Sequence, residues 1–140
     1  MQFQLVSITG TKYDAEAYEV LVPTLGGTIA IFKDHMPLIS AAQPGVLSVR
    51  KKAGDPDSEL ENFAINGGVV HVDGKTVYFI ADDVTAPDEL SEQEATAALR
   101  RAEELVKSAG SQTALAEAQH LLRHSSAKLQ VARLKKRHHR

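Results

Sequence analysis

Short apolar runs separated by turn residues fill the first part of the chain. They recur about every 8–12 residues, a spacing typical of short strands in an all-β fold. Within several runs apolar and polar positions alternate, as in strands with one face buried. The runs are residues 3–8, 17–22, 29–32, 46–49, 60–65, 69–72 and 77–81. The pattern predicts an all-β sandwich, or flattened antiparallel barrel.

The stretch 20–38 shows how turn residues direct this chain. Two short apolar strands, at 20–22 and 29–32, are separated by Pro23 and the pair Gly26-Gly27. Proline fixes φ and glycine accepts positive φ, so this order of residues predicts a turn. A second turn carries the polar tip Lys33-Asp34-His35. A polar tip on a rigid strand pair suits contact with a partner better than catalysis.

The glycine pairs invite comparison with phosphate-binding loops. Neither Gly26-Gly27 nor Asn66-Gly67-Gly68 is followed by a helix start or by the Gly-Lys-Ser/Thr that wraps phosphates. We interpret them as hairpin and bulge glycines. Asp73-Gly74, between two apolar runs, predicts a tight hairpin.

The hydrophobic period changes at Ala86-Pro87, where helical spacing begins. Ser91 and Glu94 have the spacing of a capping box, and Gly110 stands where a left-handed cap would end the first helix. A second helix is predicted from about residue 113 to 135. Its apolar stripe alternates steps of three and four: Leu115, Ala118, Leu122, Ser125, Leu129 and Ala132. These features predict a C-terminal antiparallel α-helical hairpin.

We therefore expect two units, a β-sandwich over 1–87 and a helical hairpin over 88–140. The seam between the helices is narrow and rich in alanine, so it buries little apolar surface. The composition predicts a hairpin that is held weakly and could open or dock again.

Composition narrows the class of protein. The chain has 140 residues, 43% hydrophobic and 24% charged, with no cysteine or tryptophan. These values fit a soluble protein of one domain, or of one domain with an appendage, without disulfides or thiolate metal sites. We expect no signal peptide and no spanning helix, so any membrane association would be peripheral.

Charge divides the chain in two. Residues 1–87 hold 6 Lys and Arg against 11 Asp and Glu, and residues 88–140 hold 10 against 7. Beyond Glu117 every charged side chain apart from histidine is basic: Arg123, Lys128, Arg133, Lys135, Lys136, Arg137 and Arg140. Such a run could be a solvated helix face, a nucleic-acid site or a surface that docks on acidic protein. It has no aromatic residue to stack on bases, so we favour docking on protein.

The histidines offer no clear catalytic or metal site. His35 follows Asp34, but neighbouring loop residues rarely face one another and no nucleophile is placed nearby. His120 and His124 lie one helical turn apart, a spacing that can bind metal. The segment lacks a further ligand and contains Arg123, so we predict a solvated helix face.

Several short sequence motifs, taken together with their order along the chain, point to one protein family. The chain resembles the epsilon subunits of bacterial F-type ATP synthases over essentially its full length, including the change from β runs to two helices. The motifs are Val22-Pro23, Gly27-Thr28-Ile29-Ala30-Ile31, His35-Met36-Pro37-Leu38, Pro44-Gly45 and Gly67-Gly68-Val69.

The resemblance implies a non-catalytic rotor subunit of the proton-translocating enzyme, peripheral at the cytoplasmic face of the bacterial plasma membrane. Its sandwich would pack on the gamma subunit and on the ring of c subunits, with ring contact near Thr28, Lys33 and His35. Its hairpin would rest on the sandwich or extend along gamma. When extended, its basic residues would meet the beta subunits and inhibit ATP hydrolysis, through Arg123, Lys128, Arg133, Lys135 and Lys136.

Two departures from the family pattern change what we expect. Lys33-Asp34 stands where Pro-Gly is common, which predicts a different tip shape. Some bacterial members bind ATP on the hairpin, but here Ser91 and Glu94 replace the aspartate and arginine of that signature, and the second-helix positions are His124 and Lys128. Glu94 would repel a phosphate. We expect no useful ATP binding, and no cofactor or metal.

Two other classes compete with a rotor subunit. One is a free binding module whose basic helices grip nucleic acid or anionic lipid, which salt-sensitive RNA binding would favour. The other is a small hydrolytic enzyme, for which no catalytic constellation is present in the sequence.

Overall fold

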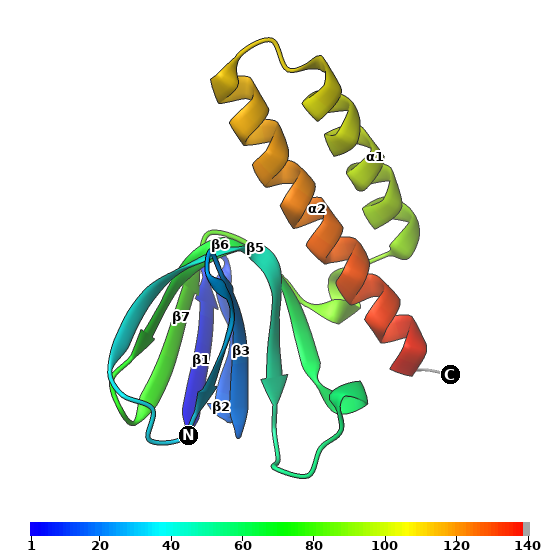
Figure 1. Cartoon of the computed structure of the whole chain (residues 1–140). Coiled ribbons are helices and arrows are strands. Elements are labelled where there is room, and N and C mark those ends of the chain that lie inside the picture. Colours follow the sequence, from blue (N-terminus) through cyan, green and yellow to red (C-terminus); the bar gives the residue numbers. More distant parts are fainter. Residues whose placement is uncertain (139–140) are drawn as a thin grey trace.

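The computed structural model describes residues 1–138, with the side chains of Lys136 and His138 outside the description. Within that range eight strands are followed by two helices (Figure 1). Two short 3₁₀ turns, Asp57–Glu59 and Pro87–Glu89, lie between elements. The elements are β1 (Gln2–Ser7), β2 (Gly10–Glu16), β3 (Glu19–Thr24), β4 (Gly27–Phe32), β5 (Leu38–Arg50), β6 (Glu61–Val72), β7 (Thr76–Ala81), β8 (Val84–Thr85), α1 (Glu92–Ser108) and α2 (Gln112–His138).

The strands form the predicted sandwich, built from one folded sheet that is not closed. Its order is β2-β1-β7-β6-β5-β3-β4, with β8 paired to β6. All pairs are antiparallel except β1 with β7, which run parallel. The long strands β5 and β6 bend across the top of the sandwich (Figure 1). The largest fully buried side chains between the layers include Phe3, Leu5, Ile31, Leu47, Phe63, Ile65 and Phe79.

Two predicted runs, 60–65 and 69–72, belong to the single strand β6. Asn66-Gly67-Gly68 lies in its middle, where β6 bends rather than ends. Gly68 has φ +148°, and a Cβ there would overlap the carbonyl oxygen of Ile80 and the ring of Phe79. This glycine is therefore required by the close approach of β7.

The strand β2 was absent from the predicted runs. Its sequence is mostly polar and only Tyr13 is buried, so it carries no hydrophobic alternation. Its strand conformation follows from pairing with β1.

The tight hairpin at Asp73-Gly74 is confirmed. Gly74 has φ +100°, and the amides of Lys75 and Thr76 donate to Oδ1 of Asp73 at 2.9 and 2.8 Å. These two hydrogen bonds hold the pKa of Asp73 below its ordinary value, because they stabilise the ionised carboxylate.

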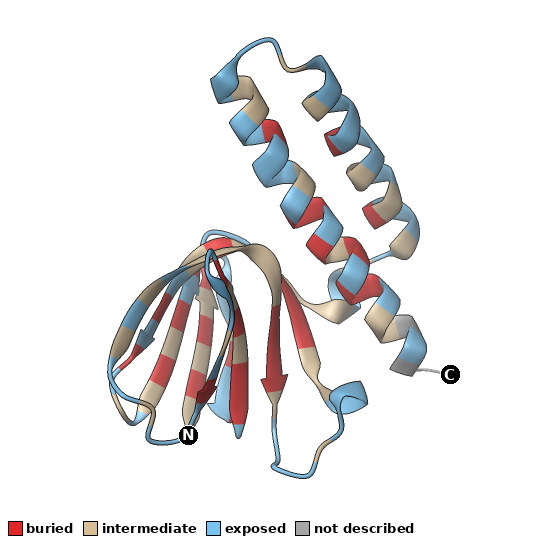
Figure 2. Cartoon of the chain, in the orientation of Figure 1, coloured by how far each residue is buried: buried red, intermediate tan, exposed pale blue. Residues whose placement is uncertain are grey.

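The helices form the predicted antiparallel hairpin. The amide of Glu94 donates to Oγ of Ser91 at 3.5 Å, as expected for a helix cap. The prediction of a left-handed cap at Gly110 was wrong: α1 ends at Ser108, the following Ala109 is extended, and Gly110 has no positive φ. The chain turns instead at Ser111, whose Oγ accepts from the amide of Ala114 at 3.1 Å. Buried side chains in the hairpin include Ala95, Ala102, Ala118, Ser125, Leu129 and Ala132 (Figure 2).

Candidate functional site

The helix α2 docks on β5 and β6 at one end of the sandwich (Figure 1). Ala127 and Val131 pack on Ala64 of β6, with Val46 and Leu90 half-buried around them. This hydrophobic cluster, which we call the dock, is separate from the core of the sandwich. At about 25 cal/mol per Å², such small side chains contribute little to the free energy of docking.

A polar contact lies beside the dock. His124 is only 5% exposed, and its Nδ1 lies 3.2 Å from the carbonyl oxygen of Ile65 in β6. Its Nε2 lies 3.0 Å from Oδ2 of Asp83, between β7 and β8, and Nζ of Lys128 lies 3.9 Å from the same oxygen. Burial lowers the pKa of His124, and the hydrogen bond with Asp83 offsets part of that effect.

The prediction that His120 and His124 share a solvated face was wrong for His124. His120 is exposed, whereas His124 faces the sandwich. Sequence reasoning followed only the stripe that meets α1. A second stripe, formed by His124, Ala127 and Val131 at steps of three and four, was readable, but its polar and small members hid it.

The four positions of the degenerate nucleotide signature fall into two pairs. Ser91 and Glu94 meet at the start of α1, whereas His124 and Lys128 both face Asp83. The contact of the first pair uses the backbone amide of Glu94, whose side chain is exposed, whereas the second pair contacts Asp83 through its side chains.

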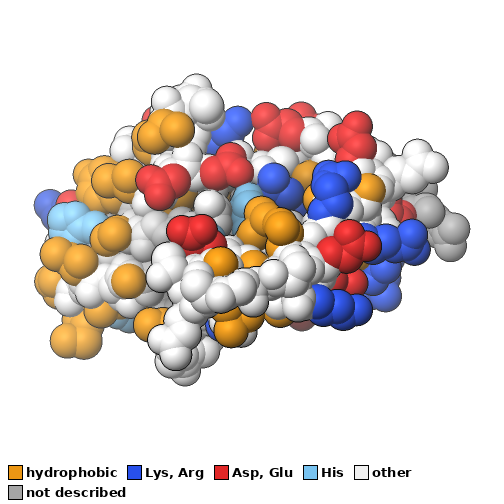
Figure 3. Space-filling view, turned by 90° about the horizontal axis from the view of Figure 1, so that it is seen from above, with side chains coloured by type: hydrophobic (Ala, Val, Ile, Leu, Met, Phe, Trp, Pro, Cys, Tyr) orange, Lys and Arg blue, Asp and Glu red, His pale blue; other side chains and the backbone are white. Residues whose placement is uncertain are grey.

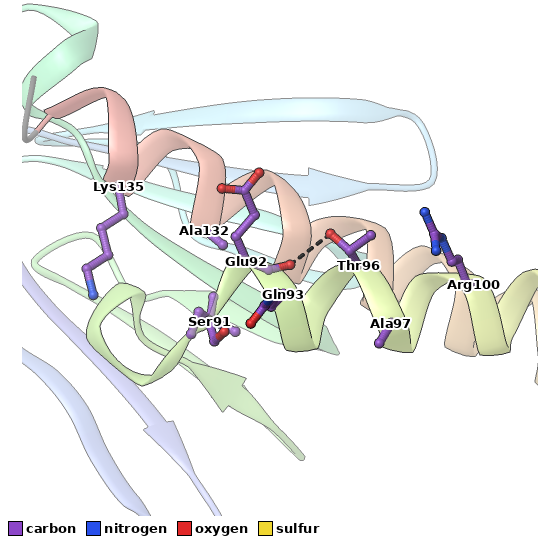
Figure 4. Close-up of a pocket in the computed structure, with 9 residues that line it drawn as sticks. Ser91, Glu92, Gln93, Thr96, Ala97, Arg100, Ala132 and Lys135 are labelled. Atoms are coloured by element: carbon purple, nitrogen blue, oxygen red, sulfur yellow. Dashed lines mark hydrogen bonds between the residues drawn. The ribbon is translucent and has the colours of Figure 1, made fainter.

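An open crevice lies between the start of α1 and the C-terminal part of α2 (Figure 4). Its walls mix signs of charge, since Glu92, Arg100 and Lys135 all line it. Oγ1 of Thr96 donates to the carbonyl oxygen of Glu92 at 2.8 Å, as Figure 4 shows. Among the side chains that the structure describes, no group of three or more His, Asp and Glu could hold a metal ion.

The predicted basic contact residues of α2 differ in exposure. Arg123 and Arg133 are exposed, and Lys128 and Lys135 are half-buried. Nε of Arg133 lies 3.8 Å from Oε1 of Glu92. The predicted contact Lys136 has its side chain outside the described residues.

The predicted contacts Thr28, Lys33 and His35 lie along the edge strand β4. Thr28 is exposed at its start, and the turn with Lys33 and His35 follows its other end. Asp34 in this turn has φ +64°, so it keeps the left-handed backbone that glycine would adopt. Nδ1 of His35 donates to the carbonyl oxygen of Met36 at 2.7 Å.

Sequence reasoning missed an apolar patch on the outer face of the sheet. Ile39, Val69 and Ile80 are 72%, 45% and 62% exposed on the neighbouring strands β5, β6 and β7. His71 and Tyr78 extend this outer face, with their rings 6.0 Å apart. Seen from above, hydrophobic side chains gather on the left of the molecule, and Lys and Arg on the right (Figure 3). Neither helix in the described part of the chain is long and apolar enough to cross a membrane.

Comparison with known proteins gives these features a context. Residues 1–87 match the family model of the ATP synthase delta/epsilon chain β-sandwich domain. The chain is 33% identical to the ATP synthase epsilon chain of Hydrogenovibrio crunogenus, covering all of this chain and 94% of that one. It is 32% identical to the epsilon chain of Neisseria meningitidis serogroup C, covering 94% and 91%.

Solved structures share the fold at low identity. A chain of the Euglena gracilis mitochondrial ATP synthase OSCP/F1/c-ring structure matches with a TM-score of 0.74 and 17% identity, covering 89% of this chain and 76% of that one. A chain of the Tetrahymena thermophila mitochondrial ATP synthase central stalk and c-ring structure matches with a TM-score of 0.63 and 16% identity. The match covers 94% of this chain and 96% of that one.

With these matches, a β-sandwich followed by a docked helical hairpin identifies a non-catalytic subunit of the central stalk of an ATP synthase. More narrowly, the chain belongs to the family of ATP synthase epsilon chains. The resemblance read from the sequence is thereby confirmed.

Proposed function

We propose that the sandwich joins the gamma subunit to the ring of c subunits, while the hairpin leaves the sandwich to restrain ATP hydrolysis. The observation that carries this proposal is the separation of two hydrophobic clusters. The sandwich core holds the large side chains, whereas the dock holds Ala64, Ala127 and Val131. A hairpin attached by so small a cluster can move without disturbing the core.

The gamma subunit is the partner proposed for the outer sheet face. Three neighbouring exposed apolar side chains, Ile39, Val69 and Ile80, form a patch that suits a protein partner. Pull-down with a cognate gamma subunit tests this contact. Ile80→Asp should weaken binding at least tenfold, because it leaves a charge buried in the interface. Ile8→Asp, at an exposed position of the β1–β2 turn outside this patch, is the control; equal binding by both variants would refute the assignment.

The edge strand β4 is the surface proposed for the c-subunit ring. Thr28 at one end and the turn with Lys33 and His35 at the other lie on one continuous edge of the sheet. The chain has no cysteine, so single cysteines at Thr28 and His35 would report on their own surroundings. Both should cross-link to c subunits, whereas Thr11→Cys on the opposite edge strand β2 should not. Cross-linking from Thr11 alone would reverse the proposed orientation.

Inhibition is assigned to the basic side chains of α2, which we propose bind acidic segments of the beta subunits after the hairpin extends. In the docked state Lys128 lies near Asp83 of the sandwich, so extension exchanges this contact for one with the partner. Removing residues 88–140 should raise the ATPase activity of the reconstituted complex. Unchanged activity would mean that the hairpin does not inhibit.

The same arrangement argues against nucleotide binding by this chain. Glu94 would repel a phosphate, and Asp83 already occupies His124 and Lys128. Titration with ATP should show no binding in the micromolar range. Micromolar binding that weakens in Lys128→Ala would overturn this expectation.

We place the chain at the cytoplasmic face of the bacterial plasma membrane, held there by its partners in the complex. Washing membranes under conditions that release the catalytic head should release the chain too. Retention after the gamma subunit has been removed would point to a direct attachment.

A further inference from the structure

One buried ionisable side chain lies between the hairpin and the sandwich. On the described part of α1 and α2, His124 is the only buried side chain that can gain a proton in the physiological range. It extends from α2 and contacts two other parts of the chain, the backbone of β6 at Ile65 and the side chain of Asp83. Its surroundings therefore exist only while the hairpin is docked.

The two contacts cannot both be satisfied by a neutral ring. A carbonyl oxygen and an ionised carboxylate only accept hydrogen bonds, and a neutral imidazole has one N–H to donate. A protonated ring could donate to both, but its charge would lie in a site that is 5% exposed. When a protonated ring docks, it gains a second hydrogen bond, but its charge is removed from water, and the two effects oppose each other.

The charged groups around the ring decide which effect is larger. Asp83, from the turn between β7 and β8, has a side chain that is 53% exposed, so water screens its attraction. Lys128, from α2 itself, competes for the same carboxylate oxygen and repels a cation on the ring. From β6 only the carbonyl of Ile65 faces the ring. Burial is therefore the larger effect.

We propose that His124 is a proton-operated latch that holds the hairpin on the sandwich when its ring is neutral and releases the hairpin when its ring is protonated. The proposal rests on the mobile hairpin of the proposed function and names what sets its position. It makes the docked state sensitive to the pH around the stalk.

The direction follows from linkage. The pKa of His124 is lowered in the docked state by burial, and in the undocked state the ring lies in water with a pKa near 6.5. Above that value both states carry a neutral ring and docking is fully favoured. As the pH falls through about 6.5 the undocked state takes up a proton, so docking weakens. One proton can change the ratio of docked to undocked chains by at most about tenfold per pH unit.

Distance measurements on the isolated full chain test the latch. Spin labels at Lys52→Cys on the sandwich and Lys107→Cys near the end of α1 would be the only labelled sites, because the chain has no native cysteine. The docked distance should dominate at pH 8, and a second, broader population should grow between pH 7 and 5.5. A distribution that does not change, or docking that strengthens in acid, would overturn the proposal.

Matched variants assign the effect to one residue. His124→Gln, which keeps a donor and cannot titrate, should remain docked with no pH response from 8 to 5.5. His120→Gln, at an exposed position one turn earlier on α2, should respond like the parent chain. A pH response that persists in His124→Gln would assign the proton elsewhere.

Nuclear magnetic resonance supplies an independent reading on the unlabelled chain, including the case in which His124→Gln fails to dock. The ring of His124 should titrate below the ordinary histidine value of about 6.5, because docking buries it. Titration at or above that value would refute the latch. These experiments use the isolated chain, so a negative result would refute the latch alone. Inhibition by the hairpin is tested separately, with the complex that lacks residues 88–140.

Discussion

A single aspartate carries the backbone conformation of the polar tip. Asp34 has φ +64°, a region that costs an ordinary L-residue about 1–2 kcal/mol, although a short polar side chain tolerates it. The sequence suggested a tip of altered shape, since Lys33-Asp34 replaces Pro-Gly. The left-handed backbone at Asp34 is a conformation that glycine adopts without a steric cost.

The tip predicts opposite results for two substitutions. Asp34→Gly should leave the free energy of unfolding unchanged or raise it, since glycine adopts positive φ without a steric cost. Asp34→Val should lower it by about 1–2 kcal/mol, because a branched side chain opposes this conformation. Urea denaturation measures both, with Lys33→Val at a neighbour of negative φ as the control. Equal destabilisation by the two valines would contradict the argument.

A second prediction concerns the close approach of two strands. Gly68→Ala should lower the free energy of unfolding by about 2–3 kcal/mol, because its methyl group would overlap Ile80 and the ring of Phe79. Gly54→Ala is the matched control, since a Cβ there meets nothing within 4 Å. Gly54→Ala should be neutral or slightly stabilising. Similar urea midpoints for the two variants would show that β6 and β7 can separate freely at this point.

At the scale of elements, two faces of α2 pack against other parts of the chain. One packs on α1, and the other places Ala127 and Val131 on the sandwich. The second face gives the hairpin a defined resting place with a small apolar contact.

The dock predicts that one substitution moves the hairpin without unfolding the sandwich. Val131→Ala should weaken docking by about 1–3 kcal/mol, since Val131 is fully buried in the dock. Hydrogen exchange should become faster in the amides of α2, while those of β1 and β7 keep their protection. Val106→Ala, half-buried on α1 and outside the dock, is the control. Faster exchange throughout the strands would show one cooperative unit.

The sequence predicted the elements with strong periodicity and missed those whose order comes from distant contacts. The hairpin and most strands could be read from spacing alone. The strand β2 could not, since pairing with β1 and not a hydrophobic pattern forms it. His124 was misread because a histidine on a charged helix looks solvated until Ile65 and Asp83 are placed beside it. The apolar patch was missed since exposed and buried valines look alike in sequence.

At the scale of the molecule, the core of the sandwich is complete without the hairpin. The buried cluster runs from Phe3 to Val84, and Ala86 is the last residue packed against it. The helices add only the dock and the polar contacts of His124 and Lys128 beside it. This arrangement explains why a predicted boundary near residue 87 is physically reasonable.

Truncation should therefore leave a folded protein. We expect residues 1–87 alone to unfold cooperatively in urea, with a free energy of unfolding that is within about 2 kcal/mol of the value for the sandwich in the full chain. The loss arises from exposure of Ala64 and its half-buried neighbours. Circular dichroism would show β structure, and a fragment without a cooperative transition would contradict two separable units.

The parallel pairing of β1 with β7 has a consequence for how the molecule is made. Gln2 pairs with Thr76, 74 positions later, so the first strand to leave the ribosome must wait for one of the last strands of the sandwich. The adjacent hairpins β3–β4 and β5–β6 need no such delay. Since long-range pairing slows folding, synthesis itself imposes an order in which the opening strand is placed late.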